Sequence, residues 1–466
     1  MAEDFSFMTI SEMSALVRDK SVSPVEIVEN VLRSVDRLEP QINAFVTVTD
    51  DLALDAARKA ESAVMAGEPL GVLAGIPMTV KDLITVGGVR CTFGSNTLSD
   101  NVATADAPAV ERIKAAGACI IGKTTTTEFG CKPSSTSPVS GTTRNPWNTE
   151  RTTGGSSSGG AAGVCAGIVP AALGTDGGGS IRIPSAFCGL FGIKAQFGRV
   201  PVFPPSATPT LAHIGPLTRT VRDGAIVLGT IAGFDGRDPA SVSEPVPDFL
   251  AACDAPLDGV RIAWSPTLGY ARPNPEIVDV ATKAIGVLEE LGCEVTLVDK
   301  VLDDPIKIWM AEFYAGVGTR LKETMANERD ILDPAVAEVL SHALDQTIDE
   351  YYGQVFERYA LREKMREFFE DFDLLISPTL PVEAFNADAD IPDELSDMNI
   401  VSWMAYPYWV NLIGAPAASV PCGFTNAGLP VGLQMVSRTN REVDLFRVAA
   451  AFEVVHPWAG KKPPVQ

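Results

Sequence analysis

The chain has 466 residues, 46% of them hydrophobic, which is enough to bury a large core in one α/β domain or in two smaller ones. Asp and Glu number 59 against 37 Lys and Arg, a formal net charge of −22, and so acidic a surface argues against nucleic-acid binding because it repels polyphosphates. The eight cysteines are scattered without the close Cys or His spacing of metal ligands, so we expect free thiols and no bound metal.

The first residues, MAEDFSFM, are acidic and lack the basic region and apolar run of a secretory signal. The longest nearly apolar stretch, 161–174, is too short to cross a bilayer and is interrupted by Pro170. We therefore expect a cytoplasmic protein that does not engage a membrane.

Helices and short apolar runs alternate along the chain. Ser23-Pro24-Val25-Glu26 supplies an N-cap, a first-turn proline and a capping-box glutamate, which predicts an amphipathic helix over 24–38. A second helix is predicted from Asp50 to about Ala66, ending at Gly67. Five apolar runs are predicted strands: 76–80, 118–122, 260–264, 294–298 and 373–379. The alternation favours an α/β fold in which helices cover a sheet.

The helical share rises between residues 238 and 370, and no linker-like tract divides the chain. We therefore expect a single domain over 1–466 with a peripheral helical section. Its four parts would be N-terminal helices (about 8–67), a catalytic core (about 70–237), the helix-rich section (about 238–370) and a return to the core (about 371–466).

The stretch GACIIGKT, from Gly117 to Thr124, matches the phosphate-loop pattern G-x-x-x-x-G-K-[ST]. A phosphate loop needs a strand, then a glycine turn, then a helix whose first amides face the phosphates. Here a short helical face ends at Gly117, and a predicted buried strand follows it with Lys123 after the strand. The order is reversed, so we interpret the match as accidental.

Two Gly/Ser segments, 154–160 and 174–180, flank a predicted small-residue helix and a strand. Taken alone, such segments are usually flexible loops. Glycine runs also permit backbone angles at which successive N–H groups converge on a phosphate or on the oxyanion of a tetrahedral intermediate. Ser180 ends the second segment, which favours a nucleophile beside such donors.

A serine nucleophile needs a base. His342 is predicted on a surface helix and His456 lies near the C-terminus, whereas His213, predicted in a loop, could serve but has no G-x-S-x-G elbow beside it. The other candidate is Lys81, which ends the apolar run IPMTV and could be an amine kept neutral by burial.

Three motifs together resemble the amidase signature family: GIPMTVKDLITVGG, ERTTGGSSSGG and GTDGGGSIRIPSAFCGLFGIK. The resemblance continues in NPWN, GPLTRTVRD, DLLISPTLP and NLIGAPAASVPCGFTNAGLPVGLQMVS, so it spans about residue 10 to the C-terminus. It implies the amidase signature fold, a large mixed sheet covered by helices on both faces, and an amidase that works through a Ser–cis-Ser–Lys triad.

Carried over residue by residue, the resemblance implies that Ser180 is the nucleophile, Ser156 the cis-serine and Lys81 the base. Ser157 would hydrogen-bond Lys81, and a serine acyl-enzyme would form without any cofactor. The backbone amides that would receive the oxyanion are those of Gly177, Gly178, Gly179 and Ser180.

Asp176 and Arg182 bracket the implied nucleophile and are expected to hold its loop rather than to act chemically. The chain departs from the family pattern at Thr153, where Pro is usual, and at Ala195-Gln196, where a Pro-Thr pair is common. Neither departure falls on the implied triad.

The substrate pocket is less defined. Cys131 is one candidate for its wall. An aromatic cluster precedes Asn411, and the sequence leaves open whether it lines an acyl pocket or belongs to the core: Trp403, Tyr406, Tyr408 and Trp409.

The rival within the family is the glutamine-hydrolysing component of a tRNA-dependent amidotransferase, its A subunit. That component usually carries an Asp seven residues before the Asn equivalent to Asn411, and this chain has Met404 there. The resemblance therefore favours a stand-alone hydrolase acting on a small-molecule amide, ester or hydrazide. A homodimer is left open.

Overall fold

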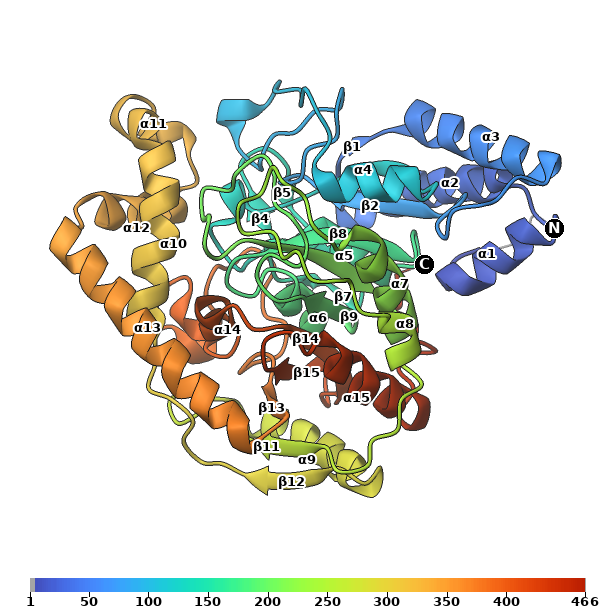
Figure 1. The fold of residues 1–466 in the computed structure, drawn as a ribbon. Coiled ribbons are helices and arrows are strands. Elements are labelled where there is room, and N and C mark those ends of the chain that lie inside the picture. The colour runs from blue at the N-terminus through green and yellow to red at the C-terminus, as the bar shows by residue number, and fades with distance from the viewer. Residues whose placement is uncertain (1–4, 466) are drawn as a thin grey trace.

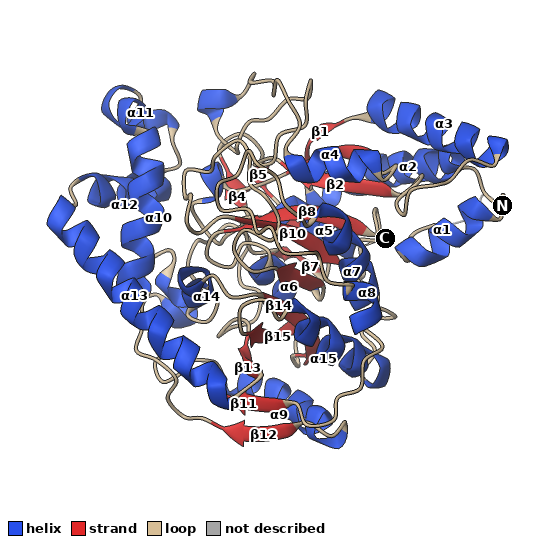
Figure 2. Ribbon diagram, viewed as in Figure 1, coloured by secondary structure: helices blue, strands red, loops and turns tan. Residues whose placement is uncertain are grey.

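The computed structural model describes residues 5–465, so the first four residues of the acidic start lie outside the described part. An eleven-stranded sheet runs through that part (Figures 1 and 2). In sheet order its strands are β1 (Phe45–Val48), β3 (Cys119–Thr124), β2 (Pro77–Lys81), β8 (Ala171–Asp176), β10 (His213–Thr218), β9 (Phe191–Lys194), β14 (Ala417–Phe424), β15 (Pro430–Ser437), β13 (Leu374–Pro378), β11 (Arg261–Trp264) and β12 (Glu294–Leu297).

The sheet is mixed. β2 is parallel to β3 and β8, and β11 is parallel to β12 and β13, whereas the pairs between β8 and β13 are antiparallel. Two small ladders lie outside it: β4 (Thr136–Ser137) with β5 (Gly141–Thr142), and β6 (Arg144–Asn145) with β7 (Asn148–Thr152). The expected α/β class with a large mixed sheet is confirmed.

Helices cover both faces of the sheet (Figure 2). One face carries α1 (Ile10–Arg18), α4 (Pro108–Ala115), α7 (Val221–Ile231), α8 (Phe249–Ala252), α9 (Pro275–Glu290) and α15 (Glu442–Val455). The other carries α2 (Pro24–Ile42), α3 (Asp50–Ala66), α5 (Ser158–Cys165), α6 (Arg182–Cys188), α10 (Ile306–Arg320), α11 (Lys322–Asn327), α12 (Pro334–Leu344), α13 (Ile348–Asp371) and α14 (Tyr408–Ile413).

Alternation along the strands produces these two cores. In β3, Ile120 packs into the core under α4 and α7, whereas Cys119 and Ile121 pack into the core under α2, α3 and α5. Successive side chains of a strand point to opposite faces, so one buried strand serves both layers.

The predicted elements are present, with shifted ends. The first predicted helix continues past 38 to Ile42 and contains Pro40 in its last turn. It ends at Asn43, whose φ of 50° is left-handed. β3 likewise continues through Lys123, which lies within the strand rather than after it and forms a buried ion pair with Asp82 (3.0 Å). Within GACIIGKT, residues 119–124 therefore form a strand, and its lysine is already paired.

The helix-rich section is not peripheral throughout. α10 to α13 form an outer flank, coloured yellow to orange in Figure 1, while β11 and β12 of the same section join the sheet. Trp309 on α10 donates its indole N–H to the carbonyl oxygen of Gly177 (2.9 Å). The section thus reaches the second Gly/Ser segment, which corrects the expectation from the sequence.

The small residues of α5 allow this helix to approach its neighbours closely. A Cβ on Gly159 would overlap the carbonyl oxygen of Ala44 and lie 2.6 Å from the amide nitrogen of Thr125. Four residues further along the same helix, a Cβ on Gly163 would have no heavy atom within 4 Å.

Gly159→Ala is therefore expected to lower the free energy of unfolding by about 1–3 kcal/mol through overpacking. Gly163→Ala should leave it unchanged or raise it by up to about 1 kcal/mol, because alanine is the better helix former. Urea unfolding of the two variants measures the difference. Equal midpoints would contradict the packing described for α5.

Candidate active site

Lys81 lies at the end of β2, next to parallel strand β8, where Val80 pairs with Leu173. Its side chain is fully buried, and its Nζ atom lies 2.7 Å from Ser156 Oγ, 3.0 Å from Ser157 Oγ and 2.8 Å from Thr175 Oγ1. Burial lowers the pKa of the Lys81 amine well below its usual range, and the negative charge of Asp176 opposes this only in part. The structure therefore brings Lys81, Ser156 and Ser157 together as expected and adds Thr175.

The two serine segments are joined through the backbone. The Gly155–Ser156 peptide bond is cis, as the resemblance implies. The amide of Ser157 donates to the carbonyl oxygen of Ser180 (3.1 Å), which fixes Ser180 beside the start of α5. Ser156 and Ser180 line the same cavity.

This cavity has a volume of about 590 Å³ and a largely apolar wall. Loops supply much of the wall, and α10 supplies Phe313 and Val317. The apolar residues that line it include Leu83, Ile84, Phe93, Leu98, Phe129, Val202, Phe203, Phe313, Val317 and Leu321.

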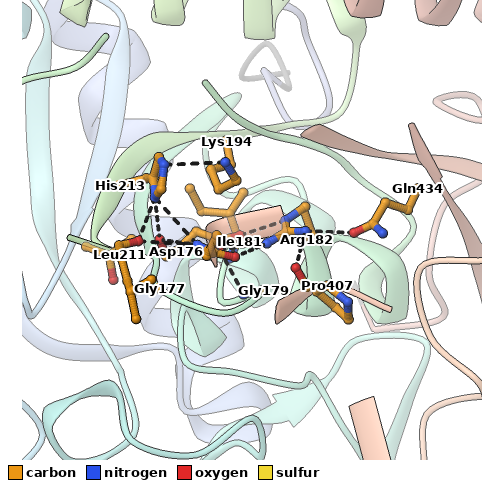
Figure 3. Close-up of polar contacts among 12 residues, drawn as sticks. Asp176, Gly177, Gly179, Ile181, Arg182, Lys194, Leu211, His213, Pro407 and Gln434 are labelled. Atoms are coloured by element: carbon orange, nitrogen blue, oxygen red, sulfur yellow. Dashed lines mark hydrogen bonds and ion pairs between the residues drawn. The ribbon is translucent and has the colours of Figure 1, made fainter. Parts of the chain in front are cut away.

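A buried ion pair joins Asp176 of the second Gly/Ser segment to Arg182 at the start of α6 (Figure 3). Arg182 Nη2 lies 2.9 Å from Asp176 Oδ1, and both side chains are fully buried. Burial would raise the pKa of Asp176, but the Arg182 guanidinium outweighs it and holds that pKa below its usual range. Arg182 also donates to the carbonyl oxygen of Pro407 (2.9 Å) and to side-chain oxygens of Gln434 and Asn411 (both 2.7 Å).

Asp176 also accepts a hydrogen bond from the amide of Gly179 (2.8 Å). This amide is therefore engaged by a carboxylate, which differs from the expectation that it faces an oxyanion together with Gly177 and Gly178. The loop-holding role expected of Asp176 and Arg182 has a physical basis in these contacts.

His213 is the first residue of β10 rather than part of a loop. Its Nδ1 lies 2.7 Å from the carbonyl oxygen of Leu211 and 3.1 Å from that of Asp176, so Nδ1 carries the proton. Its Nε2 lies 3.4 Å from Lys194 Nζ. Burial, reinforced by Lys194, lowers the pKa of His213 well below its usual range. His213 is thus a neutral imidazole that contacts Leu211, Asp176 and Lys194.

Three candidates for the pocket wall lie elsewhere. Cys131, Trp403 and Tyr406 are buried in the core rather than among the cavity-lining residues. Trp403 stacks on Phe187, with ring centroids 6.5 Å apart, and the Tyr406 hydroxyl donates to the carbonyl oxygen of Pro266 (2.6 Å). Within residues 5–465, no three His, Cys, Asp or Glu side chains are grouped closely enough to hold a metal ion.

Comparison with known proteins agrees with the fold. The Amidase family model matches residues 26–446. Over 470 residues the chain is 36% identical to an acylamidase of Rhodococcus erythropolis, covering 99% of this chain and 98% of that protein. It is 37% identical to the A subunit of the glutamyl-tRNA(Gln) amidotransferase of Thermosynechococcus vestitus, covering 97% of this chain and 99% of that protein.

A crystal structure of a bacterial aryl acylamidase, 30% identical, superimposes with a TM-score of 0.93 and covers 98% of this chain and all of that one. The chain therefore belongs to the amidase signature family, and this membership indicates that it is an amidase.

In the described residues no helix has the length and apolar character needed to span a membrane.

The Asp176–Arg182 pair makes a direct prediction about stability. Asp176→Asn leaves the buried Arg182 guanidinium without a countercharge, so the free energy of unfolding should fall by about 3–5 kcal/mol. The matched control is Asp397→Asn, which breaks the exposed pair with Arg272 (2.8 Å) and should change stability little. Urea unfolding compares the two, and similar midpoints would argue against a structural role for the pair.

Proposed function

We propose that this protein hydrolyses carboxylic amides through a serine acyl-enzyme, with Ser180 as nucleophile, Ser156 as proton relay and Lys81 as base. The observation that carries the proposal is the fully buried Lys81 amine, 2.7 Å from Ser156 Oγ and with a lowered pKa. A neutral amine has the lone pair that a general base needs.

The neighbouring hydroxyls give the relay a direction. Ser157 Oγ lies 3.2 Å from the carbonyl oxygen of Thr175, an obligate acceptor, so its proton points there and its oxygen accepts from Lys81. Thr175 Oγ1 accepts the second N–H of Lys81. A neutral amine has two protons, so its lone pair is left for the hydroxyl proton of Ser156.

The proposed reaction then balances without a cofactor. Ser180 Oγ attacks the amide carbonyl carbon and passes its proton to Ser156, whose own proton moves to Lys81. As the tetrahedral intermediate collapses, Lys81 returns a proton through Ser156 to the leaving amine, and the C–N bond breaks. Water repeats the attack on the acyl-enzyme and releases the carboxylic acid.

The amides of Gly177, Gly178 and Ser180 are the proposed oxyanion donors. The Gly179 amide is left out of this set because it donates to Asp176. A single oxyanion-hole donor contributes roughly 3–4 kcal/mol to the transition state.

The cavity supports an apolar or aryl acyl group as the preferred substrate, since its wall is largely aliphatic and aromatic. The similarity to the amidotransferase component of Thermosynechococcus vestitus supports the alternative, glutamine hydrolysis with a partner protein. Met404 favours the hydrolase, because it is buried and offers no carboxylate for a substrate ammonium group. Assays of the purified chain with anilides, esters, hydrazides and glutamine distinguish the two functions.

We expect a fluorophosphonate probe to label the protein at Ser180 and inactivate it. Peptide mapping identifies the labelled residue, and Ser180→Ala should abolish both the label and the amide cleavage. A label on another residue would reject Ser180 as nucleophile.

Lys81→Ala should lower kcat for amide cleavage by about 10²–10⁴-fold, the usual contribution of a general base. Ser157→Ala is the matched control, because it removes one neighbour of the amine but leaves Ser156 in place, so its loss should be smaller. Circular dichroism confirms that both variants are folded. Full activity of folded Lys81→Ala would remove the lysine from the mechanism.

A further inference from the structure

We propose that Trp309, on α10, is a positioning residue that orients the Gly178 amide toward the oxyanion. This inference rests on the proposed function. Trp309 lies in the helix-rich section, 127 residues beyond Arg182 in the chain and outside every motif that carries the family resemblance. Its indole N–H donates to the carbonyl oxygen of Gly177 (2.9 Å), and the side chain is 2% exposed.

The orienting effect follows from peptide geometry. In a planar trans peptide the C=O and N–H groups point in opposite directions. A donor that holds the carbonyl oxygen of one residue therefore fixes the direction of the N–H of the next residue.

Two consecutive peptides of the Gly/Ser segment are held in this way. The carbonyl oxygen of Asp176 lies 3.1 Å from His213 Nδ1 and 3.1 Å from Asn411 Nδ2, which directs Gly177 N–H away from them. Figure 3 shows Asp176 and Gly177 beside the His213 ring. The carbonyl oxygen of Gly177 is held by Trp309, which directs Gly178 N–H away from the indole.

The glycines make these external anchors necessary. Glycine has no Cβ to restrict its backbone, so the Gly177–Gly178 peptide can rotate unless another group holds it. The indole also packs directly on this peptide, since a Cβ on Gly178 would lie 2.5 Å from Trp309 Cζ2. A hydrogen bond and close packing thus act on the same peptide.

The anchor is connected to the substrate cavity. Trp309 stacks on Phe313, with ring centroids 4.5 Å apart and an interplanar angle of 24°, and Phe313 lines the cavity. A Cβ on Gly177 would lie 2.8 Å from the Phe313 ring. One face of α10 therefore forms cavity wall and also holds an oxyanion donor in place.

The test is Trp309→Phe, which keeps an aromatic ring but removes the N–H donor. We expect kcat for an anilide substrate to fall about 10–100-fold with KM nearly unchanged, less than the 10²–10³-fold loss seen when a donor is removed outright. Affinity for a trifluoromethyl ketone, which forms a tetrahedral adduct with the serine, should fall in parallel. Affinity for the carboxylic acid product should not change.

The matched control is Trp458→Phe. Trp458 is 5% exposed and its indole N–H donates to the carbonyl oxygen of Arg219 (2.8 Å), so the same hydrogen bond is lost outside the site. If Trp309→Phe does not fold, 3-benzothienylalanine at position 309 retains the shape of the indole and lacks its N–H.

The inference is overturned if the Trp309 variant binds the trifluoromethyl ketone as tightly as the unaltered protein. It is also overturned if both tryptophan variants lose the same activity, or if only KM changes. Failure of the proposed function is distinguishable, because the unaltered protein would then show no amide cleavage that depends on Ser180.

Discussion

The arrangement of the site depends on a lysine amine held away from water among hydroxyl groups. Burying an ammonium ion is costly. The hydrogen-bond partners of Lys81 are hydroxyls rather than carboxylates, so no direct countercharge offsets this cost and burial favours the neutral amine over the ammonium. Asp176 stabilises the charge at longer range, but its own charge is taken up by Arg182. Lys123, on the neighbouring strand β3, is equally buried but has a different partner: it forms an ion pair with the carboxylate of Asp82 (3.0 Å).

The Asp176–Arg182 pair links this chemistry to the rest of the fold. Arg182 connects the start of α6 to α14 and β15 through Asn411 and Gln434, while Asp176 ends β8 and holds the Gly179 amide. The glycine segment is thus anchored to α6, α14 and β15, and α10 contributes a further anchor through Trp309. Such supports let backbone donors keep one geometry, which is what stabilisation of a developing charge requires.

Much of the fold was predictable because its signals are local. Helix caps at Ser23 and Gly67 and apolar runs such as those of β2 and β13 depend on neighbouring residues in the chain. The motif resemblance likewise predicted that Lys81, Ser156 and Ser157 lie close together. The cavity wall was not predictable, because it combines loop residues such as Phe93 and Phe203 with Phe313 from a helix far along the chain. Aromatic side chains near Asn411 gave a misleading signal, since Trp403 and Tyr406 are large apolar groups that the core also needs.

The most direct test of this account is the pKa of the Lys81 amine in the folded protein. It can be measured by NMR with ε-¹³C-labelled lysine, the Lys81 resonance being assigned by its absence in Lys81→Met. We expect Lys81 to be uncharged at neutral pH and to titrate well below the reference value of about 10.4. An amine that remains protonated up to that value would contradict the account, because it would have no lone pair with which to accept the proton of Ser156.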